Sequence, residues 1–125
     1  PEILARKAAH LARYEANLAD LPDVYLLKQQ LKSGYVPFRL FLFSPAGEAL
    51  LNYVNENGVQ SRPFFYPLHR QPCFASLRET QNLDDSRFPN SIRAHEHGQC
   101  LPIHPALSES DIDRVSEVVR SYFER

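Results

Sequence analysis

The sequence predicts a small α+β domain, a two-layer sandwich in which a short, mainly antiparallel sheet of about three strands packs against helices. Three observations predict this class: long helix-period patterns open and close the chain, apolar extended segments alternate with helical ones between them, and prolines and glycines mark the boundaries. A chain of 125 residues with 43% hydrophobic content can bury one core but not two. We therefore expect a single domain over residues 1–125.

The first predicted helix covers residues 2–20, where leucines and alanines recur at helical spacing and Pro22 follows the last turn. Residues 24–34 are then expected to form a short extended piece and a loop. The strongest strand signal is YVPFRLFLF at residues 35–43, which is apolar on both faces after Pro37 and should be largely buried. Pro37 belongs near the start of this strand or on an edge, because it has no amide hydrogen to donate.

A second helix is predicted to begin at Ser44 and Pro45, which suit the N-cap and the first helical residue. Asn57 and Gly58 should end it with a left-handed C-terminal cap. Residues 59–65 follow as a second extended segment, which a proline interrupts.

The next part of the chain alternates between irregular and regular structure. Residues 67–85 are expected to be mostly irregular, with a turn of helix around residues 74–77. Pro89 can open a helix that Gly98 closes, and residues 100–103 should form a short strand.

The last predicted helix begins after a capping box, in which Asp111 follows Ser108 by three residues. Isoleucine and valines then recur at helical spacing up to Tyr122, so one face of this helix should be buried. Together these elements give an alternation of helices and strands between long N- and C-terminal helices.

Composition excludes several classes of function. The net charge is −1, so no basic field is present to attract nucleic acid. No apolar run approaches the roughly 20 residues of a membrane span. Two cysteines are too few for the disulfide framework of a small secreted domain, and we expect two reduced thiols in a cytoplasmic protein.

A metal site is suggested by the residue types of His95, His97, Cys100 and His104, but not by their spacing. The first two lie two residues apart on a predicted helix and so point in different directions, and the other two straddle the end of a strand. We expect no metal here, and a solvated helix end with a loop histidine instead.

Two further residues suggest catalysis only weakly. A free N-terminal proline can act as a general base, as in tautomerases, but Pro1 precedes a helical pattern rather than the strand that buries such a proline. Cys73 has no supporting pattern for a nucleophile, and we expect it to be a buried or half-buried small hydrophobe. The sequence begins at Pro1 and has no methionine, which fits either a removed initiator or a chain cut from a longer one.

Three ordered stretches, which cover most of the chain, resemble the C-terminal small domain of the DegT/DnrJ/StrS family of sugar aminotransferases, enzymes of pyridoxal-phosphate fold type I. The central stretch is GVQSRPFFYPLHRQPCF, residues 58–74, where the family has a similar Arg-Pro and Pro-Leu-His followed by Gln-Pro. The second is FPNSIRAHEHGQCLPIHPALSESDIDRV, residues 88–115, with a Leu-Pro-x-His-Pro strand end before the last helix. The third is ARKAAHLARYEANLADLPDV, residues 5–24, which is similar to the helix leading into the small domain.

The resemblance implies a domain type rather than an activity for this chain alone. In the family, the large N-terminal domain holds the cofactor and supplies the Schiff-base lysine. The lysines here are Lys7, Lys28 and Lys32, and no Ser-x-x-Lys pattern surrounds them. A pyridoxal-phosphate enzyme needs a buried, activated lysine, so we expect this chain to hold no cofactor and to be inactive alone.

The resemblance also implies that Arg62, Tyr66 and His69 lie on a loop that walls the nucleotide-sugar pocket of the parent enzymes. Their chemistry suits that role, because arginine pairs with phosphate or carboxylate and histidine exchanges a proton near neutral pH. The neighbouring Phe64 and Phe65 are expected to pack the loop onto the sheet instead, with one of them facing the core.

Three hypotheses for function follow. The chain is a stand-alone or truncated small domain without catalysis of its own, half of a split aminotransferase completed by a separate large-domain chain, or a module that binds a nucleotide sugar or a protein. The completed enzyme would transfer an amino group from glutamate to a keto group of a nucleotide-linked sugar. The face that would dock a large domain is expected to be apolar and to drive homodimer formation, with the first helix as one possible site.

Overall fold

The computed structural model describes residues 2–28, 34 and 36–125, and these form the predicted α+β fold. The elements, in which η marks a short 3₁₀ turn, are α1 (Glu2–Leu18), β1 (Tyr25–Leu26), β2 (Leu40–Phe43), α2 (Gly47–Glu56), β3 (Arg62–Pro63), η2 (Leu68–Arg70), η3 (Pro72–Phe74), α3 (Ala75–Thr80), η4 (Asp85–Arg87), α4 (Pro89–His97), β4 (Gly98–Leu101) and α5 (Glu109–Phe123). None of these helices is long and apolar enough to cross a membrane.

Within the described residues, the sheet has four short strands in the order β1-β2-β4-β3, and every neighbouring pair is antiparallel. In the register, Leu42 lies opposite Gln99, and Cys100 lies between Phe41 on one side and Arg62 on the other. The sheet is therefore antiparallel, as the sequence predicted, and β4 lies between two strands from earlier in the chain.

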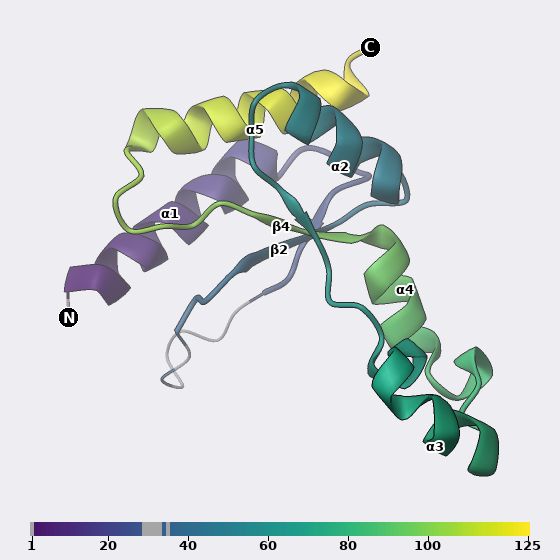
Figure 1. The fold of residues 1–125 in the computed structure, drawn as a ribbon. Coiled ribbons are helices and arrows are strands. Elements are labelled where there is room, and N and C mark those ends of the chain that lie inside the picture. Colours follow the sequence, from purple (N-terminus) through teal and green to yellow (C-terminus); the bar gives the residue numbers. More distant parts are fainter. Residues whose placement is uncertain (1, 29–33, 35) are drawn as a thin grey trace.

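Helices cover one face of this sheet. Figure 1 shows α1, α2 and α5 on one side of the strands, whereas residues 67–97, which we call the arm, extend away from them. The core lies between the sheet and these helices and includes Tyr14, Leu40, Leu42, Leu50, Val54, Ile112 and Val119, none of which is exposed. Each of these core residues occupies an apolar position of a predicted helix or strand, so the spacing of apolar residues in the sequence could predict the two-layer arrangement.

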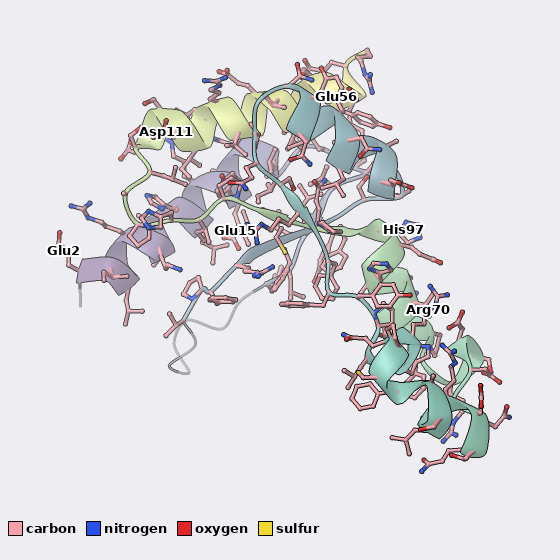
Figure 2. The ribbon with its side chains drawn as sticks, viewed as in Figure 1. Glu2, Glu15, Glu56, Arg70, His97 and Asp111 are labelled. Atoms are coloured by element: carbon pink, nitrogen blue, oxygen red, sulfur yellow. The ribbon has the colours of Figure 1, made fainter. Side chains whose placement is uncertain are left out.

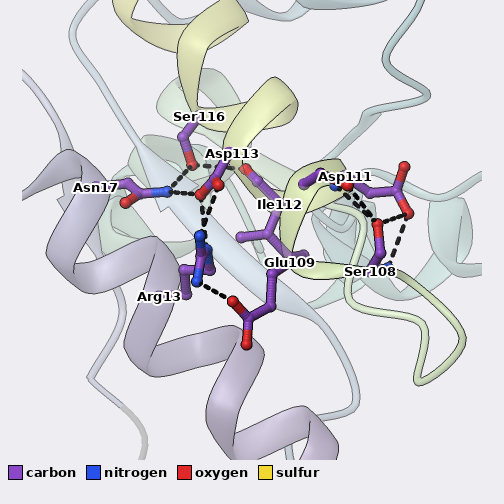
Figure 3. A network of polar contacts seen from close by, with 9 residues as sticks. Arg13, Asn17, Ser108, Glu109, Asp111, Ile112, Asp113 and Ser116 are labelled. Atoms are coloured by element: carbon purple, nitrogen blue, oxygen red, sulfur yellow. Dashed lines mark hydrogen bonds and ion pairs between the residues drawn. The ribbon is translucent and has the colours of Figure 1, made fainter.

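Polar contacts join the two long helices beside the core (Figure 3). Arg13 on α1 donates two hydrogen bonds to the carboxylate of Asp113 on α5, at 2.7 and 2.6 Å, and Asn17 donates a third at 2.9 Å. The hydrogen bonds from Arg13 and then Asn17 lower the pKa of Asp113 to about 2. At the start of α5, Ser108 and Asp111 form the predicted capping box.

The start of α2 differs from the prediction. The helix begins at Gly47 rather than at Pro45, because Gly47 has a φ of +41° that interrupts the helical path. Ser44 instead closes a turn before the helix, since its hydroxyl accepts a hydrogen bond from the amide of Ala46 at 3.2 Å. The predicted left-handed end is confirmed, with Gly58 at a φ of +79°.

The strand boundaries also differ. β2 begins at Leu40 instead of residue 35, which itself lies outside the described residues, and β4 begins at Gly98 instead of Cys100. Gly98 belongs to the ladder because it pairs with Phe43, and a Cβ there would lie only 2.7 Å from the Phe43 ring and 2.9 Å from Phe64. The glycine that ends α4 is thus also the residue that lets two aromatic rings approach the sheet.

Candidate functional site

The face of the sheet opposite the helices carries an aromatic cluster and is only partly covered. Because Leu40 and Leu42 point into the core, the alternate residues Phe41 and Phe43 lie on the open face. The ring of Phe64 packs against both of them, at centroid distances of 5.1 and 5.4 Å.

Large apolar side chains at the border of this cluster are exposed. Tyr25 and Phe65 are each 53% exposed and Phe38 is 69% exposed. Side chains of this size normally contribute strongly to contacts when another surface covers them. The open face therefore has a border of exposed, large apolar side chains.

The predicted site residues separate into two places. Arg62 is exposed on β3, lies opposite Cys100 and lines a surface hollow of about 630 Å³ at one end of the open face. Tyr66 directly precedes the arm, and its ring packs edge-on against His95 of the arm at 5.1 Å and lines another hollow with Arg70. Figure 2 shows Arg70 within the arm and His97 where α4 meets the sheet.

His69 is buried rather than exposed on a pocket wall. Its Nε2 lies 2.9 Å from Oδ1 of Asp85, and its ring stacks on Phe88 at 4.5 Å. These contacts hold the turn η2 against η4 and the start of α4. The role of His69 in a nucleotide-sugar pocket stays a prediction, and in this chain the histidine also fixes the shape of the arm.

Sequence reasoning missed the ion pair that accompanies this histidine. Arg70 Nε donates to Oδ1 of Asp85 at 2.9 Å, and Nη2 donates to the other carboxylate oxygen. The hydrogen bonds from Arg70 and then His69 lower the pKa of Asp85 well below its ordinary value. The partners lie 15 positions apart in the sequence, with η3 and α3 between them, so no local spacing could have indicated the pair.

The suspected metal ligands do not converge. His95 Nδ1 lies 3.3 Å from the carbonyl oxygen of Phe64, His104 Nδ1 accepts the amide hydrogen of Ala106 at 3.1 Å, and Cys100 is buried on β4. In the part of the chain that the structure describes, no group of three or more His, Cys, Asp or Glu side chains could hold a metal ion.

Cys73 and Cys100 are both free thiols, and the exposure of Cys73 differs from the prediction. Cys73 is exposed, whereas the sequence suggested a buried or half-buried position. The reason is local: Cys73 lies in the short turn η3, which contributes no buried residue, so its side chain has no core to enter.

The described lysines do not fit a pyridoxal-phosphate site. Lys7 lies on α1, where its ammonium donates to the carbonyl oxygen of Pro37 at 2.7 Å, and Lys28 is exposed. A Schiff-base lysine needs a desolvating pocket that keeps its amine unprotonated, and neither residue has one. Lys32 and Pro1 lie outside the described residues.

Comparisons with known proteins identify the fold and the family. The model of the DegT/DnrJ/EryC1/StrS aminotransferase family matches residues 1–120. GDP-perosamine synthase of Vibrio cholerae is 30% identical over 76 residues, which are 61% of this chain and 19% of that protein. The dTDP-4-dehydro-2,3,6-trideoxy-D-glucose 4-aminotransferase of Saccharopolyspora spinosa is 25% identical over 121 residues, or 94% of this chain and 29% of that protein.

Solved structures share the fold of this chain. The putative sugar aminotransferase Spr1654 of Streptococcus pneumoniae superposes with a TM-score of 0.83 at 17% identity, over 99% of this chain and 31% of that structure. The aminotransferase TlmJ of Streptoalloteichus hindustanus gives a TM-score of 0.80 at 22% identity, over 97% of this chain and 32% of that structure. This chain thus spans about a third or less of these relatives, and it belongs to the DegT/DnrJ/EryC1/StrS aminotransferase family.

Proposed function

We propose that this chain supplies the small-domain wall of a nucleotide-sugar binding site and does not transfer amino groups by itself. The observation that carries the proposal is the family match over residues 1–120, combined with coverage of only 19% of one relative and 29% of another. The rest of the site would come from a large domain that binds pyridoxal phosphate. In the completed enzyme, amino transfer from glutamate to a keto group of a nucleotide-linked sugar is the reaction.

The open face of the sheet supports the proposal that a large domain supplies the rest of the site. Its exposed border residues Tyr25, Phe38 and Phe65 would be covered by the large-domain polypeptide. Arg62 lies next to this surface, so a partner that covers the aromatic cluster would also enclose the guanidinium. The lysine geometry supports the other half of the proposal, since neither described lysine is placed to bind the cofactor.

The test mixes this chain with the large domain of a sugar aminotransferase and measures both complex formation and amino transfer. We expect no amino transfer and no visible cofactor absorbance from this chain alone, and both complex formation and activity from the mixture. Phe65→Asp should abolish complex formation, whereas Leu77→Asp, the same type of change at an exposed residue of α3, should not. Amino transfer by this chain alone would refute the proposal, as would a mixture that neither binds nor reacts.

A second candidate function uses the same surface for self-association. Exposed aromatic side chains without a covering domain favour pairing of two copies, and we propose a homodimer when no large domain is present. Sedimentation at increasing concentration should show a dimer that Phe65→Asp converts to monomer. A chain that stays monomeric at high concentration would exclude the homodimer. The remaining hypothesis would then be a binding module, which calorimetry with nucleotide sugars tests.

We propose the cytoplasm as the place where the chain functions. Both cysteines are free thiols, which suits a reducing compartment. The exposed Cys73 makes this testable, because labelling with a membrane-impermeant thiol reagent should require cell lysis. Labelling of intact cells would contradict the assignment.

A further inference from the structure

A groove lies at the other end of β2 from the hollow that Arg62 lines together with Lys7 and Arg39. Its walls come from the chain between α1 and β1, from β1 and the residue after it, from the end of β2 with the turn that follows, and from α4. The volume of this α4 groove is about 760 Å³, which is within the range of sites for small molecules.

The floor of the α4 groove is apolar and largely aromatic. Tyr25 and Phe43 lie opposite each other on neighbouring strands, with 6.3 Å between their ring centroids and 39° between the ring planes. Leu27, which is 37% exposed, continues this surface along the edge of the sheet. On the facing wall Ala94 contributes only a methyl group, so α4 leaves room above the rings. The floor therefore suits an apolar or aromatic body of a ligand.

One face of α4 supplies hydrogen-bond donors to the groove. Asn90, Arg93, Ala94 and His97 are spaced as neighbours on a single helix face, and all four line the groove. Nη2 of Arg93 donates to Oδ1 of Asn90 at 2.9 Å, which orients the guanidinium, and no carboxylate of the described residues pairs with it. The remaining N–H groups of Arg93 form a planar fork that matches the two oxygens of a carboxylate.

His97 adds an unsatisfied polar atom at the end of this helix face, where α4 meets the sheet (Figure 2). Its Nδ1 is shielded from water and has no hydrogen-bond partner among the described residues. A buried polar atom without a partner costs free energy, and a turn of the ring toward a ligand oxygen would break no hydrogen bond of this nitrogen. His97 can therefore join Arg93 in holding an anionic group.

Asp23 brings an anion to the same groove from the chain between α1 and β1. Its side chain is exposed, and no described residue donates a hydrogen bond to its carboxylate or forms an ion pair with it. Asp23 and Arg93 thus line one groove without neutralising each other. An unpaired anion and an unpaired cation beside an apolar floor are complementary to a ligand that carries both charges on an apolar body.

We infer that the α4 groove binds a free apolar or aromatic amino acid, with its carboxylate on Arg93 and His97, its ammonium group on Asp23 and its side chain on the rings of the floor. The terminus of a peptide has only one of the two charges. Glutamate has a second carboxylate, for which the apolar floor offers no cation. The inference goes beyond the proposed function and needs neither cofactor nor second domain. Because Tyr25 also belongs to the border that a large domain would cover, the groove is open to a ligand in the chain without that domain.

The test is titration of this chain with L-phenylalanine, N-acetyl-L-phenylalanine, L-phenylalaninamide and L-glutamate, followed by calorimetry at low ionic strength, where screening is weak. The acetylated compound lacks the ammonium charge and the amide lacks the carboxylate. We expect free L-phenylalanine to bind tightest and each of the other three to bind about fivefold or more weakly, because each loses a charge-assisted contact or places a charge on the apolar floor.

Two variants assign the charges to their partners. Arg93→Gln should weaken L-phenylalanine by about fivefold or more and remove its advantage over the amide, whereas Asp23→Asn should remove its advantage over the acetylated compound. Both positions are exposed, so both variants should fold. Arg114→Gln and Glu117→Gln are the matched controls, because they remove the same charges from exposed positions on α5 and should leave Kd unchanged.

Amide NMR spectra locate the ligand. L-Phenylalanine should shift the signals of Tyr25, Leu27, Arg93 and His97 and leave those of α5 in place. The inference is overturned if L-phenylalanine does not bind, if a blocked compound or glutamate binds as tightly, or if the α5 variants weaken binding as much as those of the groove. Failure of amino transfer in the two-chain mixture would leave this binding intact, so the two proposals can fail separately.

Discussion

Tyr14 ties the first helix to the end of β4, and its hydroxyl is the group whose removal we expect to be most informative. The side chain is 0% exposed, and its hydroxyl donates to the carbonyl oxygen of Pro102 at 2.9 Å. Pro102 follows β4 directly and precedes Ile103 and His104, which line the hollow. The change Tyr14→Phe keeps the ring and removes only this hydrogen bond.

The expected loss of stability depends on how far the broken hydrogen bond is shielded from water. A part-buried carbonyl that loses its donor costs about 1–2 kcal/mol, because water replaces the bond only incompletely beside the buried Tyr14 ring. The unfolding entropy of a 125-residue chain is about 0.26 kcal/mol/K, so the midpoint of thermal unfolding should fall by about 4–8 °C. Tyr53→Phe is the matched control: its hydroxyl lies 3.1 Å from that of Ser121 in a half-buried position, and its loss should cost less than about 0.5 kcal/mol.

The assay is chemical denaturation of both variants, with the slope checked to be unchanged. The pH dependence provides an independent check. Burial, and next the charge of Asp111, raises the pKa of Tyr14 above its ordinary value of 10.0. The neutral phenol therefore stabilises the fold below about pH 10, and this stability is lost as pH rises further. Tyr14→Phe should flatten that alkaline decline, and a Tyr14→Phe variant as stable as Tyr53→Phe would refute the reasoning.

The hydrogen-bonded guanidinium of α1 lowers the pKa of Asp113 to about 2, so this carboxylate stabilises the fold above about pH 4, and stability should decline from pH 4 to 2 less steeply in Asp113→Asn. Gly47→Ala should cost about 2–4 kcal/mol in denaturation, because its Cβ would lie 2.3 Å from the carbonyl oxygen of Glu96 at a φ of +41°; a neutral result would contradict the close approach. Ser108→Ala should cost about 1 kcal/mol through loss of the capping box, and Ser110→Ala, next in the same turn, should cost less.

The sequence was most informative where burial is periodic. The helices α1 and α5 and the capping box of α5 were predicted because apolar side chains repeat at helical spacing and the cap has a fixed local pattern. Strand ends were less predictable, because a residue such as Gly98 joins the ladder for a reason that lies elsewhere in the chain: the rings of Phe43 and Phe64 need its missing side chain.

The candidate site was predictable only in part. The resemblance selected Arg62, Tyr66 and His69 as one group, but the chain places Arg62 at the hollow on the sheet, Tyr66 directly before the arm and His69 within it. Lys7 and Arg39 gave no signal, since they lie far from Arg62 in sequence and only the fold brings them to the same hollow. The strand order β1-β2-β4-β3, which the local sequence does not encode, decides which side chains lie side by side on the sheet.

The arm is held by few buried contacts, and this affects how the domain unfolds. Its turns and helices η3, α3, η4 and α4 contribute no buried residue, and its cohesion depends on His69, Phe88 and the carboxylate of Asp85. Such a segment can unfold in a sub-global step that leaves the core intact. Amide hydrogens of α3 and α4 should therefore exchange with solvent long before those of α1 and α5. The free energy that maintains the fold is thus concentrated in the core between the sheet and α1, α2 and α5, and the arm contributes little of it.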